Sequence, residues 1–291
     1  MEKYIVLQTI GKGSFGTVTL VKRKADGKVL VWKELDYGKM SEREKNHVVT
    51  EVNLLRELRH PFIVKYCDRI IDKQTTKLYI VMEYCPGGDL AKLIKKHRAE
   101  RSYIKEKYIW KFISQLVLAL EECHTHKNSS GITTPILHRD IKPANIFIDT
   151  TGDVKLGDFG LARELSSESK FAETYVGTPY YMSPELISQL KYNKSCDIWA
   201  LGCLAYELAA LRPPFEATNH LSLALKISEG RFPRIPSRYS DALQQFIQGA
   251  LQVNVSSFST VLTQVITISQ VIVGFDFSLC CSKHVGQRLT N

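Results

Sequence analysis

A glycine-rich segment between two strand-like runs is the feature that most constrains the fold of this chain. Residues 11–16 read Gly-Lys-Gly-Ser-Phe-Gly, and the flanking runs 4–10 and 17–23 are rich in β-branched and apolar residues. Glycines let a backbone approach a triphosphate and direct N–H groups at its oxygens. The same spacing opens a helix in dinucleotide-binding folds. Because a strand pattern follows Gly16, we expect a hairpin over phosphates, and a dinucleotide oxidoreductase is the weaker alternative.

The remaining sequence predicts a β-rich part followed by a mainly helical part. Alternating or continuous apolar runs bounded by turn residues indicate strands, and apolar residues three and four apart indicate helices. The expected elements are strand 28–36, helix 44–58, strand 77–84, helix 109–124, strands 144–149 and 153–160, and helix 195–211. This order favours an α+β chain of two lobes, with a cleft between them.

The most specific motif lies at 138–145, with the sequence His-Arg-Asp-Ile-Lys-Pro-Ala-Asn. Phosphoryl transfer needs a group that orients the attacking hydroxyl and accepts its proton, and Asp140 fits this role. Lys142 is placed to neutralise charge on the transferred phosphate. Mg²⁺ prefers hard oxygen ligands, and Asn145 and Asp158 offer them. These residues together predict phosphoryl transfer from a magnesium–nucleotide complex.

A lysine and a glutamate complete the expected catalytic set. Lys33 lies in the strand-like run Val-Trp-Lys, where its ammonium could bind the α- and β-phosphates. It needs a carboxylate to hold it, and Glu51 in the following helix is the candidate. Either residue taken alone would be read as an ordinary surface position. Their order relative to the other motifs favours the catalytic interpretation.

Composition limits the other classes of function. The net charge of +9 fits either a solvated basic surface or a preference for acidic partners. The sequence has no compact Lys/Arg stripe with interleaved aromatic residues, so we expect no nucleic-acid binding. The seven cysteines are scattered without metal-ligand spacing, which fits a reducing compartment. The N-terminus has no signal-peptide character, so a cytoplasmic location is expected.

The ordered motifs resemble the protein kinase superfamily. The motifs that carry this resemblance are GKGSFGTV, VWK, Glu51, HRDIKPAN, DFG, SPE and DIWALG. Longer stretches are similar to the NIMA-related Ser/Thr kinases, above all to the branch that acts in mitosis and centrosome separation. These stretches are LVWKELDYG, TEVNLLRELRHP, RIIDKQTTKLYIVMEYCPGGDL, KLGDFGLAR, VGTPYYMSPE and ALRPPF. The resemblance runs from about Tyr4 to Asn254.

The resemblance implies a two-lobed kinase domain over 1–254, with an N-lobe of about 1–84 and a C-lobe of about 85–254. It implies ATP and Mg²⁺ as cofactors, and protein Ser or Thr hydroxyls as acceptors, because Lys142 matches the Ser/Thr pattern. Met82 would be the gatekeeper, 83–85 the hinge, and Phe147 the residue under adenine. The implied ATP-binding residues are Ile10, Gly11, Lys12, Gly13, Ser14, Phe15, Gly16, Thr17, Val18, Lys33, Met82, Glu83, Cys85 and Phe147.

Further residues receive regulatory or structural roles by resemblance. Thr174, in the polar segment 162–176, is the candidate for autophosphorylation, and its phosphate could pair with Arg139. Leu55, Tyr66, His138 and Phe159 match the hydrophobic column that joins the lobes of active kinases. Asp197, in a buried helix, would hold the backbone of the catalytic loop. An unpaired buried carboxylate is costly, so we expect Asp197 to have partners.

The sequence departs from the family pattern after Asn254. Residues 255–275 carry no charge, and the arginine that normally pairs with Glu185 is absent at its expected place. Breaking such a buried pair typically costs about 3–5 kcal/mol. Three interpretations of 255–291 stay open: altered splicing or reading frame, a lineage-specific ending, or a membrane anchor. Serine, threonine and glutamine interrupt the apolar stretch, so a membrane span is not expected.

The expected function is therefore a Ser/Thr protein kinase of mitotic or centrosomal cell-cycle control. The expected location is cytoplasmic, with the centrosome or nucleus as further sites. The family's coiled-coil dimerisation region has no counterpart in this sequence. The alternative is an inactive, ATP-binding scaffold with an altered C-lobe end.

Overall fold

The computed structural model describes residues 2–13, 16–128, 130–159, 163–164, 180–188, 190 and 192–252 of the chain. In chain order, the elements are β1 (Tyr4–Gly13), β2 (Gly16–Arg23), β3 (Val29–Asp36), the short 3-10 helix η1 (Tyr37–Lys39), α1 (Glu42–Glu57), β4 (Tyr66–Asp72), β5 (Lys77–Glu83), α2 (Leu90–Ala99), α3 (Glu106–His124), β6 (Ile136–Leu137), η2 (Pro143–Asn145), β7 (Ile146–Ile148), β8 (Val154–Leu156), β9 (Arg163–Glu164), α4 (Pro184–Ile187), α5 (Lys194–Ala210), α6 (His220–Glu229) and α7 (Asp241–Ala250). This order confirms the α+β expectation.

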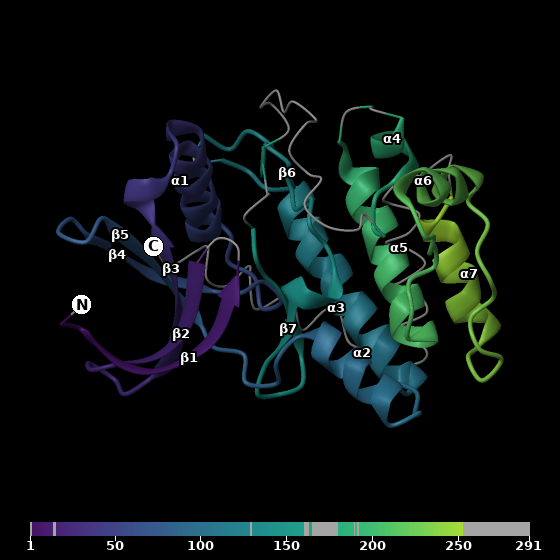
Figure 1. Cartoon of the computed structure of the whole chain (residues 1–291), viewed down its shortest axis with the longest axis horizontal. Helices are drawn as coiled ribbons and strands as arrows, with labels where there is room; N and C mark the ends of the chain where they lie inside the picture. The colour runs from purple at the N-terminus through teal and green to yellow at the C-terminus, as the bar shows by residue number, and fades with distance from the viewer. Residues whose placement is uncertain are drawn as a thin grey trace.

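The first five strands form one antiparallel sheet in the order β1-β2-β3-β5-β4, with α1 packed against one face (Figure 1). The glycine-rich segment therefore joins two strands, as predicted, rather than a strand and a helix. The sequence pattern did not predict β4, whose run YCDRIID contains three charged residues. Because β4 is an edge strand and only partly covered, it keeps polar side chains that a central strand would exclude.

Apolar side chains fill both faces of this sheet. On the face toward α1, Leu35 and Ile80 are buried in the main core. On the opposite face, the ring of Trp32 lies 4.8 Å from that of Tyr79 and 6.3 Å from that of Tyr4. This second cluster holds β1 against the centre of the sheet. It thereby positions the glycine-rich turn that follows β1.

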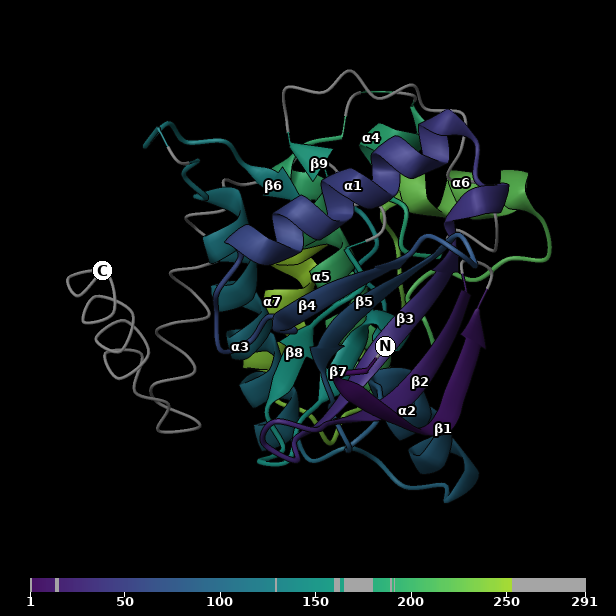
Figure 2. The same cartoon turned by 90° about the vertical axis from the view of Figure 1, so that its left-hand side faces the viewer.

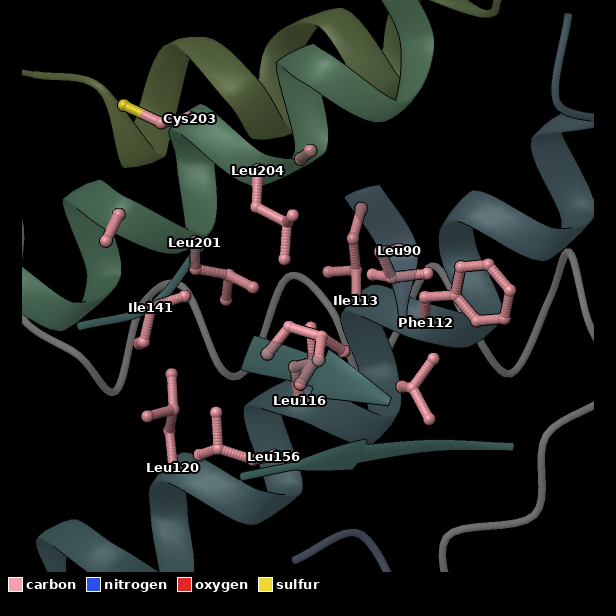
Figure 3. Packing of buried hydrophobic residues seen from close by; sticks show 14 of the residues in the cluster. Leu90, Phe112, Ile113, Leu116, Leu120, Ile141, Leu156, Leu201, Cys203 and Leu204 are labelled. Carbon is pink, nitrogen blue, oxygen red and sulfur yellow. The ribbon is translucent and has the colours of Figure 1, made fainter. Parts of the chain in front are cut away.

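The helical lobe is built around α3 and α5. Leu201 and Leu204 of α5 point toward Ile113, Leu116 and Leu120 of α3 (Figure 3). α5 is apolar nearly all round and almost wholly buried, as predicted from its sequence. On its other side α7 approaches so closely that a Cβ added at Gly202 would lie 2.8 Å from the Cβ of Ala250. Glycine is thus required for this helix contact.

Two short two-stranded sheets, one of which is the β7–β8 hairpin, lie between the large sheet and the helices. β7 pairs with β8, and β6 pairs with β9, both in antiparallel register. Single bridges connect Ile63 to Leu156 and Asp89 to Phe147, so the β7–β8 hairpin touches segments from both lobes. Figure 1 shows β7 between the N-terminal strands and α2, and Figure 2 shows β8 beside α3. The loop from β6 to β7 carries the HRD motif and therefore lies at the junction of the lobes.

Among the described residues, no helix is both long and apolar enough to cross a membrane. The residues after 252, about which the sequence left three interpretations open, lie outside the described part of the chain.

Candidate active site

The glycine-rich hairpin forms one wall of the candidate site. Gly13 of β1 pairs with Gly16 of β2, and the intervening Ser14 and Phe15 lie outside the described residues. Gly16 has φ of +144°, and a Cβ there would lie 1.9 Å from the carbonyl oxygen of Glu34. No L side chain fits that space, so glycine at this position sets how closely the hairpin lies over β3.

Lys33 lies on β3 directly beside this hairpin, paired in register with Val18. Its ammonium is 3.0 Å from Oδ1 of Asp158, which follows β8 in the other lobe. Burial by itself raises the pKa of Asp158, but the charge and hydrogen bond of Lys33, together with the nearby His138 and Lys142, lower it below its ordinary value. Glu51 lies in α1, but its side chain is outside what the structure describes, so the Lys33–Glu51 pair stays a prediction.

Asp140 is the centre of a hydrogen-bond network in the loop between β6 and β7. Lys142 donates to both carboxylate oxygens, at 2.8 and 2.7 Å. Asn145 donates through Nδ2 to Oδ2 and to the main-chain oxygen of Asp140, both at 2.8 Å. The Asp140 side chain keeps 26% of its surface exposed. It is thus fixed in orientation yet accessible to a hydroxyl group.

A buried carboxylate supports the backbone of this loop. Asp197, on α5, is fully buried and accepts hydrogen bonds from the main-chain N–H groups of His138 and Arg139, each at 3.1 Å. Tyr192 donates to it at 2.7 Å, and His124 Nε2 lies 2.8 Å away. Burial alone raises the pKa of Asp197, but these hydrogen bonds and nearby histidines lower it below the ordinary value. The prediction that Asp197 holds the loop is confirmed.

His138 connects the loop to the segment that follows β8. Its Nε2 donates to the carbonyl oxygen of Gly157 at 3.0 Å, and its ring meets that of Phe159 edge-on with centroids 4.7 Å apart. Burial lowers the pKa of His138, although Asp197 and Asp140 partly oppose this. The neutral imidazole then accepts from the N–H of Asp140 at Nδ1, 3.3 Å away. Leu55 and Phe159 share the main core, and Tyr66 packs against it.

Two residues of the site have left-handed backbone conformations. Arg139 has φ of +71° and Asp158 has φ of +55°. Such conformations cost on the order of 1–3 kcal/mol in non-glycine residues and persist where the surroundings enforce them. Here the enforcing contacts are those of Asp197 to Arg139 and of Lys33 to Asp158. Three further described residues with positive φ, Thr76, Arg101 and Leu211, lie outside the site.

Asn145 and Asp158 are brought together by the β7–β8 hairpin. Asn145 immediately precedes β7, and the Gly157 N–H donates to its carbonyl oxygen at 3.0 Å. The side-chain amide of Asn145 donates both of its hydrogen bonds to Asp140. The Oδ1 atom of Asn145 is therefore the atom that can act as a ligand. An amide oxygen and a carboxylate suit Mg²⁺, which usually takes one or two side-chain ligands together with substrate phosphates. The donor set therefore fits this ion.

The candidate adenine site lies where β5 leaves the sheet. Met82 and Glu83 end β5, and Cys85 follows them as a buried thiol whose pKa burial raises to about 12. The chain after Cys85 is fixed to β7, because Gly87 donates to the Ile148 carbonyl at 2.9 Å. Phe147 is only partly buried there, as an apolar base for a planar ring would be.

The side chain of Glu185 has a buried polar atom that is unsatisfied within the described part of the chain. Oε2 of Glu185 is buried and has no hydrogen-bond partner among the described residues. The expectation that Glu185 lacks its usual arginine stays a prediction. Residues 258–259, where that arginine would fall, lie outside the described part, as does the candidate phosphosite Thr174.

Several supporting residues were not predicted from the sequence. His124, which is distant in sequence, and Tyr192, which lies just before α5, both contact Asp197. Lys155 donates to the Pro61 carbonyl at 2.7 Å and lies 3.2 Å from Glu83, which joins β8 to the end of β5. Lys155 lies in the quoted stretch KLGDFGLAR, but no role was assigned to it, and His124 and Tyr192 lie in no quoted motif. Only the expectation that a buried Asp197 needs partners pointed in their direction.

Three features together are typical of the two-lobed kinase fold. They are a glycine-rich hairpin, a strand lysine paired with a carboxylate of the other lobe, and an ordered aspartate beside a Lys and an Asn. The sequence profile of the protein kinase domain matches residues 4–267. The chain belongs to the protein kinase family, within its NIMA-related Ser/Thr kinases.

Similar proteins come from animals, an amoeba and a fungus. The serine/threonine-protein kinase Nek2 of Mus musculus is 60% identical over 247 residues, covering 85% of this chain and 55% of that protein. A probable kinase nek2 of Dictyostelium discoideum is 55% identical over 255 residues, covering 88% and 59%. The G2-specific protein kinase nimA of Emericella nidulans is 45% identical over 272 residues, covering 87% and 39%. The chain spans about half the length of these curated relatives, or less.

Proposed function

We propose that this chain transfers the γ-phosphate of ATP to Ser or Thr hydroxyls of proteins. The observation that carries the proposal is the ordered Asp140, bound by Lys142 and Asn145 and partly exposed. In the proposed reaction the hydroxyl oxygen bonds to the γ-phosphorus, while the bond from that phosphorus to the ADP oxygen breaks. Asp140 orients the hydroxyl and takes its proton.

We propose that the remaining site residues bind ATP and Mg²⁺ and stabilise charge during this step. Lys33 binds the α- and β-phosphates, with Glu51 as its proposed partner, and Lys142 stabilises charge on the γ-phosphate. Asn145 and Asp158 would hold Mg²⁺, which supplies charge neutralisation at the phosphate oxygens. The glycine-rich segment from Ile10 to Val18 covers the phosphates. Met82, Glu83, Cys85 and Phe147 surround adenine.

We also propose a role in the mitotic cell cycle for a kinase domain spanning 1–254. Its support is similarity to relatives whose names include G2-specific kinases. The proposed location is cytoplasmic, with the centrosome or nucleus as further sites. Thr174 is the proposed regulatory phosphosite.

The test compares the wild-type chain with Asp140→Asn. Transfer of labelled phosphate from ATP to a Ser/Thr peptide mixture should fall about 10²–10⁴-fold, the usual contribution of a general base. ATP-dependent thermal stabilisation should persist, because Asp140 contacts the acceptor side. Full activity in Asp140→Asn would refute the assignment.

The buried Oε2 of Glu185 motivates the alternative of an inactive, ATP-binding scaffold. The same experiment separates the two. A wild-type chain that is stabilised by ATP and Mg²⁺ but transfers no phosphate would favour the scaffold.

A further inference from the structure

Most of the chain's excess positive charge lies in two segments of the helical lobe. Residues 90–108 form α2, the α2–α3 connection and the start of α3, and they contain seven lysines and arginines but two glutamates. Residues 231–241 lead from α6 into α7, and they contain three arginines but one aspartate. The two segments therefore carry a net charge of +7, against +9 for the whole chain. Neither contains a residue assigned to nucleotide binding or catalysis.

Direct contacts join these two segments. The hydroxyl group of Tyr239 donates to the main-chain oxygen of Ile104 at 2.9 Å. The guanidinium of Arg238 lies over the ring of Tyr103, 4.8 Å from its centroid. In Figure 1, α2 and the connection that leads into α7 both lie in the lower part of the helical lobe. The positive charges of the two segments are thus neighbours in space.

Five exposed cations around this junction form what we call the basic patch: Lys95 and Lys96 on α2, Arg101 and Lys105 in the α2–α3 connection, and Arg238. The chain folds back after α2, since the N–H of Ser102 donates to the carbonyl oxygen of His97 at 3.0 Å. Arg101 therefore lies beside the last turn of that helix. Within the described part of the chain, none of the five side chains forms an ion pair.

The acidic residues of the two segments leave the basic patch largely uncompensated. Glu106 accepts hydrogen bonds from the hydroxyl group of Ser240 and, at 2.9 Å, from its N–H. Asp241 is paired with Arg234 at 2.7 Å. Glu100 is the remaining carboxylate, against five cations. A surface with such an excess of one charge attracts anionic partners.

Two cations of the basic patch occupy positions where local structure favours other residues. Arg101 follows the end of α2 with φ of +50°, a place where helices usually have glycine or asparagine. Lys105 is the N-cap of α3, and its side chain caps no N–H group. Ser, Thr, Asp or Asn is preferred there, and a positive charge opposes the helix dipole. Departures from local preference of this kind are expected at functional sites.

We propose that the basic patch docks an acidic segment of a partner protein, whose aspartate and glutamate carboxylates pair with the five cations. Guanidinium groups bind carboxylates through two parallel hydrogen bonds, and ammonium groups bind them as compact charges. The chain's own residues 253–291 do not offer such a segment, because they contain one acidic residue, Asp276, against Lys283 and Arg288.

Two other polyanions suit this surface less well. The exposed large apolar residues of the two segments, all of which the structure describes, are Tyr103 and Tyr108, so no aliphatic side chain is available to enter a membrane. A cation lies over each of these rings, since Lys107 Nζ is 5.1 Å from the Tyr108 centroid and Arg238 covers Tyr103. These cations occupy ring surface on which the bases of a single-stranded nucleic acid would stack. Carboxylates need neither insertion nor stacking.

The test measures the fluorescence anisotropy of a labelled dodecapeptide of alternating glutamate and serine, mixed with the full-length chain at about 0.1 M salt. The patch variant is Arg101→Gly/Lys105→Asp, which gives both positions a residue that local structure favours. Its affinity for the peptide should be about tenfold or more below that of the wild-type chain. Its melting temperature should be equal or higher, so that unfolding does not account for weaker binding.

The matched control is Lys24→Glu/Lys73→Gln, at exposed positions in two turns of the five-stranded sheet, which lowers the net charge by the same amount. Its affinity should stay within about twofold of the wild type, because salt screens charges outside the binding site.

Three results would overturn the proposal. They are no binding of the peptide, equal affinities of the patch variant and the control, and tighter binding of an oligouridylate dodecamer or of phosphatidylserine vesicles than of the peptide. The peptide should bind Asp140→Asn as it binds the wild-type chain. Docking and phosphate transfer can therefore fail independently.

Discussion

The catalytic loop and the glycine-rich hairpin face each other across the candidate site but are held by different means. Side-chain hydrogen bonds fix the loop, with Asp197 binding its backbone and Lys142 and Asn145 binding Asp140. The hairpin depends on main-chain pairing and on the close approach of Gly16 to β3. The catalytic loop can be disrupted by removing a polar group, and the hairpin by adding a single carbon atom.

The largest expected effect comes from Asp197→Asn, which breaks the support of the loop. An amide cannot accept all the hydrogen bonds that the buried carboxylate accepts. Loss of one member of such a buried charged network costs about 3–5 kcal/mol. We expect urea denaturation to show a drop of that size in the free energy of unfolding, together with loss of phosphate transfer.

The matched control for this variant is Asp241→Asn. Asp241 pairs with Arg234 at 2.7 Å, but its side chain is 76% exposed. Its replacement should change the free energy of unfolding by about 0.5 kcal/mol or less. Similar stability of the two variants would show that Asp197 does not support the loop.

A smaller effect is expected from Gly16→Ala, which tests the hairpin. The added Cβ would lie 1.9 Å from the Glu34 carbonyl oxygen, so the hairpin must move away from β3. Overpacking of this kind costs about 1–3 kcal/mol. Thermal unfolding should show this loss, and the KM for ATP should rise.

Gly11→Ala is the comparison within the same hairpin. The nearest atom to an added Cβ at Gly11 is 3.9 Å away, in the side chain of Val18. The stability of this variant should stay within about 0.5 kcal/mol of the wild type. Equal destabilisation by both substitutions would mean that close approach to β3 is not what Gly16 provides.

The smallest expected effect is a pH dependence that originates in the loop. The pKa of His138 is lowered by burial, so the unfolded chain binds a proton near pH 6.5 that the folded chain does not. The stability contributed by a neutral His138 is complete above that pH and is lost as pH falls below it. For one proton the slope reaches about 1.4 kcal/mol per pH unit.

The measurement is urea unfolding at several values between pH 7.5 and 5.5, for the wild type and for His138→Phe, which keeps a ring against Phe159. The variant should lose less stability on acidification than the wild type. Parallel pH profiles would show that His138 does not titrate on unfolding.

The difference between loop and hairpin also explains what the sequence could predict. The form of the hairpin could be predicted because its two strands and its glycines all lie within residues 4–23. The strand of Lys33 and the helix of Glu51 followed from local apolar patterns in the same way, and the buried α5 followed from a segment that is apolar nearly all round.

The loop's supports were less predictable because they come from distant segments. Periodicity indicates that Asp197 is buried, but it does not say that His124, 73 residues earlier, lies beside it. Nor does it show that Lys33 pairs with Asp158, 125 residues away. The edge strand β4 was missed for a related reason, since its polar residues are permitted by its place in the sheet, which only the fold determines.

The Lys33–Asp158 pair has a consequence for nucleotide entry. Both residues are proposed to bind new partners when ATP and Mg²⁺ arrive, so entering phosphates compete with an existing interlobe attraction. Dissolved salt screens exposed charges, and the Asp158 side chain is 42% exposed. Raising the ionic strength would weaken the attraction between Lys33 and the phosphates. It would also weaken the Lys33–Asp158 ion pair, which must break when the phosphates bind. Because these two effects oppose each other, ATP affinity should depend less on salt than at a site whose lysine is unpaired.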